Sequence, residues 1–210
     1  AHVGETWEQR LARLLAHDGD RERRTGTRII PVGYLDLRVP ELAGGRYEQQ
    51  QDIYRAEIRG EFPLFREGDS LQTCTWVSAV ENLIVVELTA GTAGIERLTL
   101  DPHCGERGQY ERFAESNGVL DDVVWIRYAA NSQNVPGRRR VEMAVRVIGP
   151  EVVIDDGLFA KPIHFSLAGG ETACVVVSLL SDLDEPELVG KAIARVRGLT
   201  PDTVAAEKEK

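Results

Sequence analysis

The chain has 210 residues, of which 42% are hydrophobic and 28% charged, proportions that are ordinary for a globular protein of one large or two small domains. Its net charge of -9 argues against nucleic-acid binding, because recognition of phosphates needs a basic surface. No run of about 18 apolar residues occurs, so the sequence predicts no membrane-spanning helix and no membrane partner.

Three cysteines, Cys74, Cys104 and Cys174, are far apart in the sequence and form no CxxC pair. Their spacing therefore predicts no structural zinc site, and no motif for another metal or a cofactor is present. Cys74 and Cys174 lie in apolar strand patterns and are most simply buried free thiols, although a disulfide between two of the three is an alternative. The chain begins at Ala1 without an initiator methionine, so the sequence does not decide between a cytoplasmic and an exported protein.

The N-terminal region, residues 1–27, has the pattern of a helix followed by a polar loop. Between Gly4 and His17, apolar residues recur at spacings of three and four, which is typical of an amphipathic helix. From Arg28 the pattern changes to period two and mostly keeps it up to residue 182. We therefore expect residues 28–182 to form one β domain.

The centre of the chain shows the strand pattern most clearly. Leu71–Val77 alternates, and after a polar break Leu83–Leu88 is a short apolar run that suits a strand buried on both faces. A turn then precedes a third extended segment, which begins at Ile95. Consecutive strands joined by tight turns predict an antiparallel meander.

Further strands are expected on both sides of this centre, at Ile29–Val39, within Arg46–Glu61, and at Val123–Ala130, Val141–Ile148, Val152–Ile154, Ile163–Leu167 and Thr172–Leu180. The segment Arg46–Glu61 is one bent strand or two. Asn117-Gly118 predicts a turn, Gly149 predicts a hairpin-like return of the chain, and the last two segments are expected to close the same sheet. A strand about every ten residues is typical of a sandwich or barrel rather than an α/β fold.

The C-terminal segment, residues 183–210, returns to a helical period. One apolar face of it contains Leu188, Ala192 and Val196. Thr200 is expected to cap a last helix that has Pro201 in its first position. The chain stops within this helical pattern, so we expect the polypeptide to continue. The predicted fold is an all-β antiparallel sandwich with short N- and C-terminal helices.

The sequence contains no complete catalytic constellation. The adjacent pairs Asp121-Asp122 and Asp155-Asp156 would point to opposite faces of a strand and are interpreted as turn residues, so no catalytic residue is nominated. Three residues are candidates for ligand binding: Trp76, Trp125 and His103. The tryptophans could stack on sugar rings, with burial in the core as the alternative. The histidine adjoins Cys104 but has no further partner in the sequence that would indicate a metal site or a nucleophile.

Three phrases together resemble a known family. They are Tyr47–Ile58, then Thr75–Leu88, and Phe165–Leu167 followed by Gly170 and Cys174–Ser178. They are similar to strands of the N-terminal β-sandwich of large glycoside hydrolases of families 95 and 65, which carry a six-hairpin (α/α) barrel. The resemblance covers roughly Ile29 to Val196 and implies a supersandwich of the galactose-mutarotase type.

The resemblance implies that the catalytic carboxylates lie on a helical barrel beyond residue 210, so no catalytic residue is carried over. The chain would then be a non-catalytic domain that packs on this barrel of the same polypeptide and shapes its active site, with an oligosaccharide as a possible ligand. Such a domain should expose an apolar patch. Two alternatives stay open: a stand-alone carbohydrate-binding module, which predicts exposed aromatic rings, and a structural protein whose sandwich forms a homo-oligomer. Whether the chain is part of an enzyme is not decided by the sequence.

Overall fold

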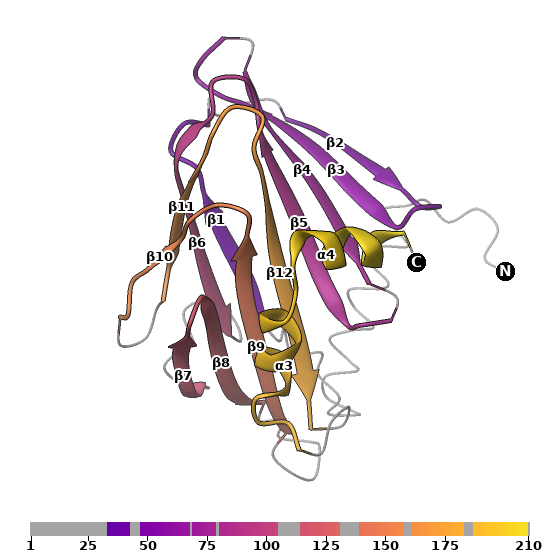
Figure 1. The fold of residues 1–210 in the computed structure, drawn as a ribbon, viewed down its shortest axis with the longest axis vertical. Coiled ribbons are helices and arrows are strands. Elements are labelled where there is room, and N and C mark those ends of the chain that lie inside the picture. Colours follow the sequence, from indigo (N-terminus) through magenta and orange to yellow (C-terminus); the bar gives the residue numbers. More distant parts are fainter. Residues whose placement is uncertain are drawn as a thin grey trace, which may run out of the picture.

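The computed structural model describes residues 33–42, 47–67, 69–78, 80–104, 114–130, 139–157, 161–182 and 187–209. These residues form two antiparallel β-sheets that face each other and two C-terminal helices (Figure 1). The predicted N-terminal helix and the loop that follows it lie outside the described residues, so that prediction is not tested. Among the described residues, no helix has the length and apolar character needed to cross a membrane.

The smaller sheet has four strands in the order β1-β6-β11-β10. Their bounds are Gly33–Arg38 for β1, Ile95–Cys104 for β6, Val153–Ile154 for β10 and Ile163–Leu167 for β11. The larger sheet has eight strands in the order β2-β3-β4-β5-β12-β9-β8-β7. Its strands are β2 (Glu48–Asp52), β3 (Glu57–Pro63), β4 (Ser70–Val77), β5 (Leu83–Ala90), β7 (Ala114–Leu120), β8 (Val123–Ala130), β9 (Arg139–Ile148) and β12 (Thr172–Ser181). The predicted all-β antiparallel sandwich is confirmed.

The segment Arg46–Glu61 contains two strands, which was one of the two readings of its pattern. Asp52 ends β2, and its carboxylate accepts hydrogen bonds from the backbone N–H groups of Tyr54 (3.0 Å) and Arg55 (3.1 Å). This turn brings β3 back along β2. A short polar side chain thus replaces the backbone hydrogen bonds that the chain lacks where it reverses.

The predicted meander is wrong after its second strand. β4 and β5 form a hairpin, but β6 crosses to the smaller sheet and pairs with β1 and β11. Strand β10 likewise pairs with β11 instead of returning onto β9, and β12 lies back in the larger sheet. Gly94 (φ 74°) and Gly149 (φ 120°) lie at two of these crossings, in a backbone region that favours glycine. An alternating pattern shows which face of a strand is buried but not which strand lies beside it.

The turn predicted at Asn117-Gly118 is also wrong, because both residues lie inside β7 and pair with Ile126 and Trp125 of β8. A Cβ atom on Gly118 would lie 2.7 Å from Cζ2 of Trp125. Glycine is therefore present because the indole ring lies over it, and not because the chain reverses.

The main core lies between the two sheets. It is formed by buried aliphatic and aromatic residues from both, including Leu88, Leu98, Val145 and Ile163. Strand β5 is buried on both faces along only part of its length, because Ile84 is 39% exposed on the inner face near the β4–β5 turn. The smaller sheet does not cover that end of the larger one.

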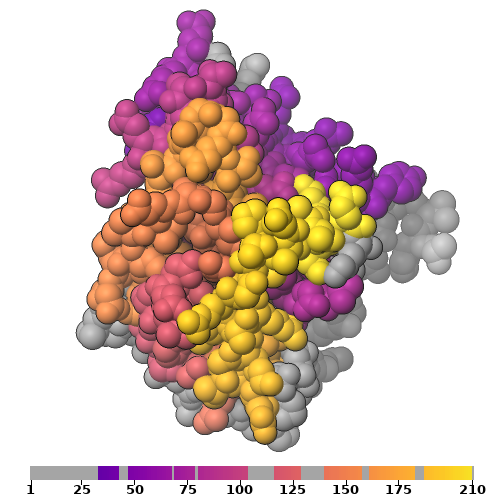
Figure 2. Space-filling view, in the orientation of Figure 1, coloured from indigo at the N-terminus to yellow at the C-terminus, as the bar shows by residue number. Residues whose placement is uncertain are grey.

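A second apolar cluster lies on the outer face of the larger sheet, under helices α3 (Lys191–Arg197) and α4 (Pro201–Lys208). The predicted apolar face of Leu188, Ala192 and Val196 is confirmed, since all three are buried in this cluster. Thr200 caps α4 and Pro201 is its first residue, as predicted. Figure 2 shows the two helices lying across the strands on this face of the molecule.

Two polar side chains of β9 hold α3 in place. Glu142 is fully buried and accepts hydrogen bonds from the backbone N–H groups of Gly190 (2.9 Å) and Ala192 (3.0 Å) at the start of the helix. The Arg146 guanidinium donates to the carbonyl oxygens of Arg197 (3.1 Å) and Leu199 (2.7 Å) at its end. Both ends of a short helix are thus satisfied by the sheet beneath it.

Candidate binding groove on the larger sheet

The outer face of β2, β3, β4 and β5 is not covered by α3 and carries two rows of polar residues. Strand register aligns Gln50, Arg59, Cys74 and Glu87 in the first row. It aligns Glu48, Glu61, Gln72 and Thr89 in the second row, two residues further along each strand. Because side chains alternate along a strand, all eight project from the same face.

A groove of about 410 Å³ lies over these two rows, and Lys208 of α4 forms part of its wall. Its lining is Glu48, Gln49, Gln50, Arg59, Gly60, Glu61, Gln72, Thr73, Cys74, Glu87, Thr89 and Lys208. The volume lies within the range of small-molecule sites, about 300–1,000 Å³. We call this site the outer groove.

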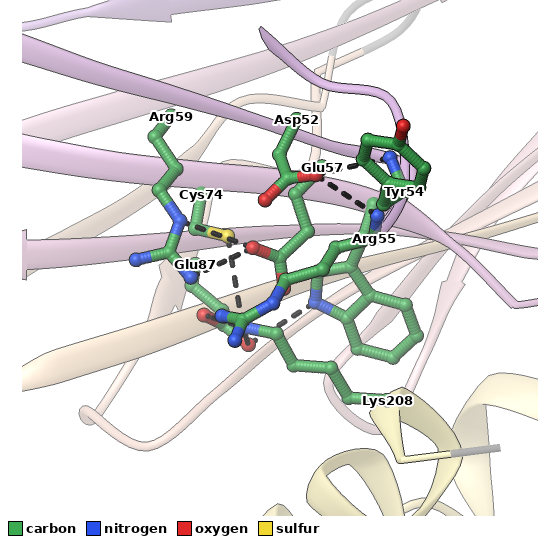
Figure 3. A network of polar contacts seen from close by, with 9 residues as sticks. Asp52, Tyr54, Arg55, Glu57, Arg59, Cys74, Glu87 and Lys208 are labelled. Carbon is green, nitrogen blue, oxygen red and sulfur yellow. Dashed lines mark hydrogen bonds and ion pairs between the residues drawn. The ribbon is translucent and has the colours of Figure 1, made fainter. Parts of the chain in front are cut away.

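An ion pair on β3 lies beside the outer groove. The Nε and Nη2 atoms of Arg59 donate to Oε2 of Glu57 at 3.0 and 2.7 Å (Figure 3). The hydrogen bond from Arg59 holds the pKa of Glu57 below its ordinary value, although burial of the carboxylate opposes this effect. The same hydrogen bond raises the pKa of Arg59. Glu57 is therefore an ionised, fixed partner that orients the guanidinium.

Lys208 joins α4 to the sheet through Glu87. Its Nζ atom lies 3.0 and 2.8 Å from the two carboxylate oxygens of Glu87 and 3.6 Å from Oε1 of Glu57 (Figure 3). Desolvation by burial would lower the pKa of Lys208, but the hydrogen bond and charge of Glu87 outweigh it and raise this pKa. The indole Nε1 of Trp76 also donates to Glu87, at 3.1 Å. The carboxylate of Glu87 is thus held from two sides.

Cys74 and Cys174 are free thiols, as the strand patterns predicted, but both are partly exposed rather than fully buried. Desolvation raises the pKa of both Cys74 and Cys174, so they are neutral at pH 7. Each is aligned with Glu87, one on either side of β5. Two strand spacings, about 10 Å, separate them, whereas a disulfide needs Cα atoms within about 7 Å. A disulfide between these two is therefore excluded in this fold.

The geometry of the outer groove suits binding better than proton transfer. A glycosidase needs a carboxylic acid with a raised pKa to protonate the leaving group. The pKa of Glu57 is lowered, and Lys208 lies between Glu57 and Glu87 as a shared cation. Among the residues that the structure describes, no cluster of three or more His, Cys, Asp or Glu side chains could hold a metal ion.

The three predicted ligand-binding residues lie apart from one another. Trp76 is only 4% exposed, in the apolar cluster near α4. Trp125 lies on β8 of the same face, half-buried, with the Arg127 guanidinium 4.6 Å above its ring. His103 lies in the smaller sheet, stacked on Tyr34 with ring centroids 4.7 Å apart. None of the three lines the outer groove, and sugar binding by them stays a prediction.

Sequence reasoning did not find Glu57, Arg59, Glu87 or Lys208. The first three alternate with apolar residues on strands and look like ordinary solvent-facing charges. Lys208 lies 121 residues from Glu87, so no spacing in the sequence relates them. Only the aligned strands and the docked helix bring these charges together.

Comparisons with known proteins support the fold but not a family. No protein-family model matches the chain, and no curated protein matches it. One solved structure similar to the chain is described as "Putative kojibiose phosphorylase from human microbiome". It superposes with a TM-score of 0.62 at 6% identity, over 86% of this chain. The chain spans 27% of the length of that protein, so the likeness concerns one part of a longer polypeptide and shows a shared fold.

Proposed function

We propose that the chain is the non-catalytic β-sandwich domain of a carbohydrate-active enzyme, which packs on a helical catalytic barrel of the same polypeptide. The observation that carries the proposal is the shared fold: 86% of this chain corresponds to 27% of a kojibiose phosphorylase-like chain.

An uncovered apolar strip supports the proposal of a packed neighbour. Ile58, Val77 and Ile84 lie on the inner face of β3, β4 and β5 and are 38%, 59% and 39% exposed. Register aligns Val77 with Ile84 on adjacent strands. Apolar residues grouped in this way on a sheet face mark a contact surface rather than a solvated one. We call these three residues the inner apolar strip and propose that the barrel covers it.

The proposed division of the chain assigns 1–27 to an N-terminal helix and loop, 28–182 to the sandwich and 183–210 to a helical connection. The described part of that connection is fixed to the larger sheet by hydrogen bonds with Glu142, Arg146 and Glu87. A rigid connection would fix the position of the barrel relative to the sandwich, which is what shaping an active site requires.

The proposal is tested on the native gene product. We expect its intact mass to exceed that of the 210 residues and its additional part to be helical by circular dichroism. Phosphorolysis and hydrolysis of kojibiose should be assayed on this whole polypeptide. The substitution Val77→Lys should lower activity or expose the protein to limited proteolysis, because it places a charge in the inner apolar strip. Val153→Lys, at a position 62% exposed in the smaller sheet, is the matched control.

Two results would overturn the proposal. The first is a native product that ends at residue 210 and binds no other kind of polypeptide. If that product is a dimer whose contact is abolished by Val77→Lys, the inner apolar strip serves self-association and the structural alternative holds. The second is a longer polypeptide in which Val77→Lys and Val153→Lys behave alike. The strip would then face solvent, and no domain would pack there.

A further inference from the structure

We infer that the outer groove binds a neutral oligosaccharide, at a site separate from any catalytic centre. The inference rests on the proposed function for its choice of ligand class and on the groove itself for everything else. The groove has a floor of paired strands, a balanced charge, unused hydrogen-bonding groups and an extended shape.

The floor is rigid because it is made of hydrogen-bonded strands and not of loops. Strands β2, β3, β4 and β5 are paired in continuous register through both rows. The paired backbone fixes the point from which each side chain projects, so a ligand meets polar groups at set positions on one face. Arg59 is fixed further, because Glu57 binds its Nε and Nη2 atoms and leaves its Nη1 edge without a partner among the described residues.

The charge balance disfavours an anionic ligand. Each cation of the groove is already neutralised: Arg59 by Glu57, and Lys208 by Glu87. The two remaining charges, Glu48 and Glu61, are negative and lie opposite each other on β2 and β3. These two carboxylates repel any further negative charge, so phosphates, nucleic acids and acidic peptides are disfavoured as ligands.

Unused hydrogen-bonding groups point to a ligand rich in hydroxyls. The side-chain amides of Gln50 and Gln72 make no hydrogen bond with the described residues, yet both project into the groove. Each amide offers two donors and an acceptor, and the free edge of Arg59 offers further donors. A guanidinium can donate to two neighbouring hydroxyl oxygens, and a side-chain amide can donate to one hydroxyl and accept from the next. Neutral sugars present such pairs along their length.

The shape suits an extended ligand. Four strands span three inter-strand spacings, about 14 Å, and the two rows lie about 7 Å apart along the strands. The floor is therefore longer across the strands than along them. A chain of two or three sugar rings can lie along the rows, across the four strands, with Lys208 in the wall of the groove.

The test measures occupancy of the outer groove itself, because a carbohydrate-active enzyme also binds sugar at its catalytic centre. Cys74 lies on the floor of the groove, whereas Cys174 is aligned with Glu87 on the far side of β5 and does not line it. We would measure the alkylation rate of both thiols in the native polypeptide by mass spectrometry. The probes are kojibiose, maltotriose and, as an anionic comparison, inorganic phosphate.

We expect a neutral sugar to slow alkylation of Cys74 but not of Cys174, and phosphate to change neither rate. Gln72→Ala should weaken this protection by about tenfold, the loss expected for one or two hydrogen bonds. Gln50→Ala should act in the same direction. Gln51→Ala is the matched control, because Gln51 is an exposed glutamine of the same strand that does not line the groove.

Three outcomes would overturn the inference. If the alkylation rate of Cys74 does not change at any sugar concentration, neither kojibiose nor maltotriose occupies the groove. Cys74 that resists alkylation without sugar shows that another part of the polypeptide fills it. Protection by phosphate shows an anion site. None of these outcomes bears on the accessory-domain proposal. That proposal stands if the native product is a longer, active polypeptide, and it fails if the product ends at residue 210.

Discussion

Lys208 and Glu87 lie 121 residues apart in the sequence, yet Nζ of the lysine is 2.8 Å from Oε2 of the glutamate. Lys208 is the last residue of α4, and Glu87 lies on the outer face of a central strand. The contact fixes α4 to the middle of the larger sheet (Figure 3), and Lys208 lines the outer groove.

Replacing Lys208 should loosen α4 without unfolding the sandwich. Lys208→Met removes charged hydrogen bonds to a half-buried carboxylate, which we expect to cost about 1–2 kcal/mol in the free energy of unfolding. Amide hydrogen exchange should increase in α4 and not in β12. Glu209→Gln, the exposed neighbour, is the control and should leave both unchanged. Equal exchange in α4 of both variants would show that the lysine does not hold the helix.

Glu142 should be far more sensitive than a surface carboxylate. It is fully buried, pairs with Arg127 at 2.6 Å and accepts two backbone N–H groups at the start of α3. Glu142→Ala leaves Arg127 and both amides without this partner, so we expect a loss of about 3–5 kcal/mol in urea unfolding. Glu96→Gln alters an ion pair with Arg66 at a glutamate whose side chain is 85% exposed and should cost less than about 1 kcal/mol. A loss of similar size in both variants would contradict this account.

The strands and helices of this fold were largely predictable because they depend on local patterns. The apolar face of α3 and the Thr200 cap of α4 follow from residues three or four positions apart, and both are confirmed. The strand at Val123–Ala130 was found in the same way, with Trp125 and Arg127 on one face. The resemblance to the sandwich of large glycoside hydrolases agrees with the shared fold of the kojibiose phosphorylase-like structure.

The pairing of strands and the outer groove were not predictable from local patterns. Strand β6 has the same alternation whether it pairs with β5 or crosses to β1, and the choice depends on packing between distant segments. The groove depends on register among β2, β3, β4 and β5 and on the docking of α4. Glu57 and Glu87 therefore look like ordinary surface residues in the sequence and become parts of a site only in the fold.

Stability in acid should depend on Glu57. Its pKa is lowered in the folded protein by the hydrogen bond from Arg59, so the folded state binds fewer protons than the unfolded state near pH 4. The contribution is therefore complete above the ordinary value of 4.5 and is lost as the pH falls through the lowered pKa. Urea unfolding of Glu57→Gln should show a smaller loss of stability over this acid range than the wild type. Glu61→Gln, at an exposed position of the same strand, should follow the wild type. Parallel curves for wild type and Glu57→Gln would refute the assignment.

Two glycines should respond in opposite ways to the same substitution. Gly118→Ala places a Cβ atom 2.7 Å from the Trp125 ring, which must move, so we expect a loss of about 1–3 kcal/mol and a shift in tryptophan fluorescence. At Gly198, which ends α3 with φ -78°, the nearest atom to an added Cβ is 3.8 Å away. Gly198→Ala should therefore stabilise the protein by about 0.4–1 kcal/mol, because it restricts only the unfolded chain. If Gly118→Ala lowers the free energy of unfolding no more than Gly198→Ala does, Gly118 does not lie beneath the indole ring. The prediction of a turn at Asn117-Gly118 would then be supported again.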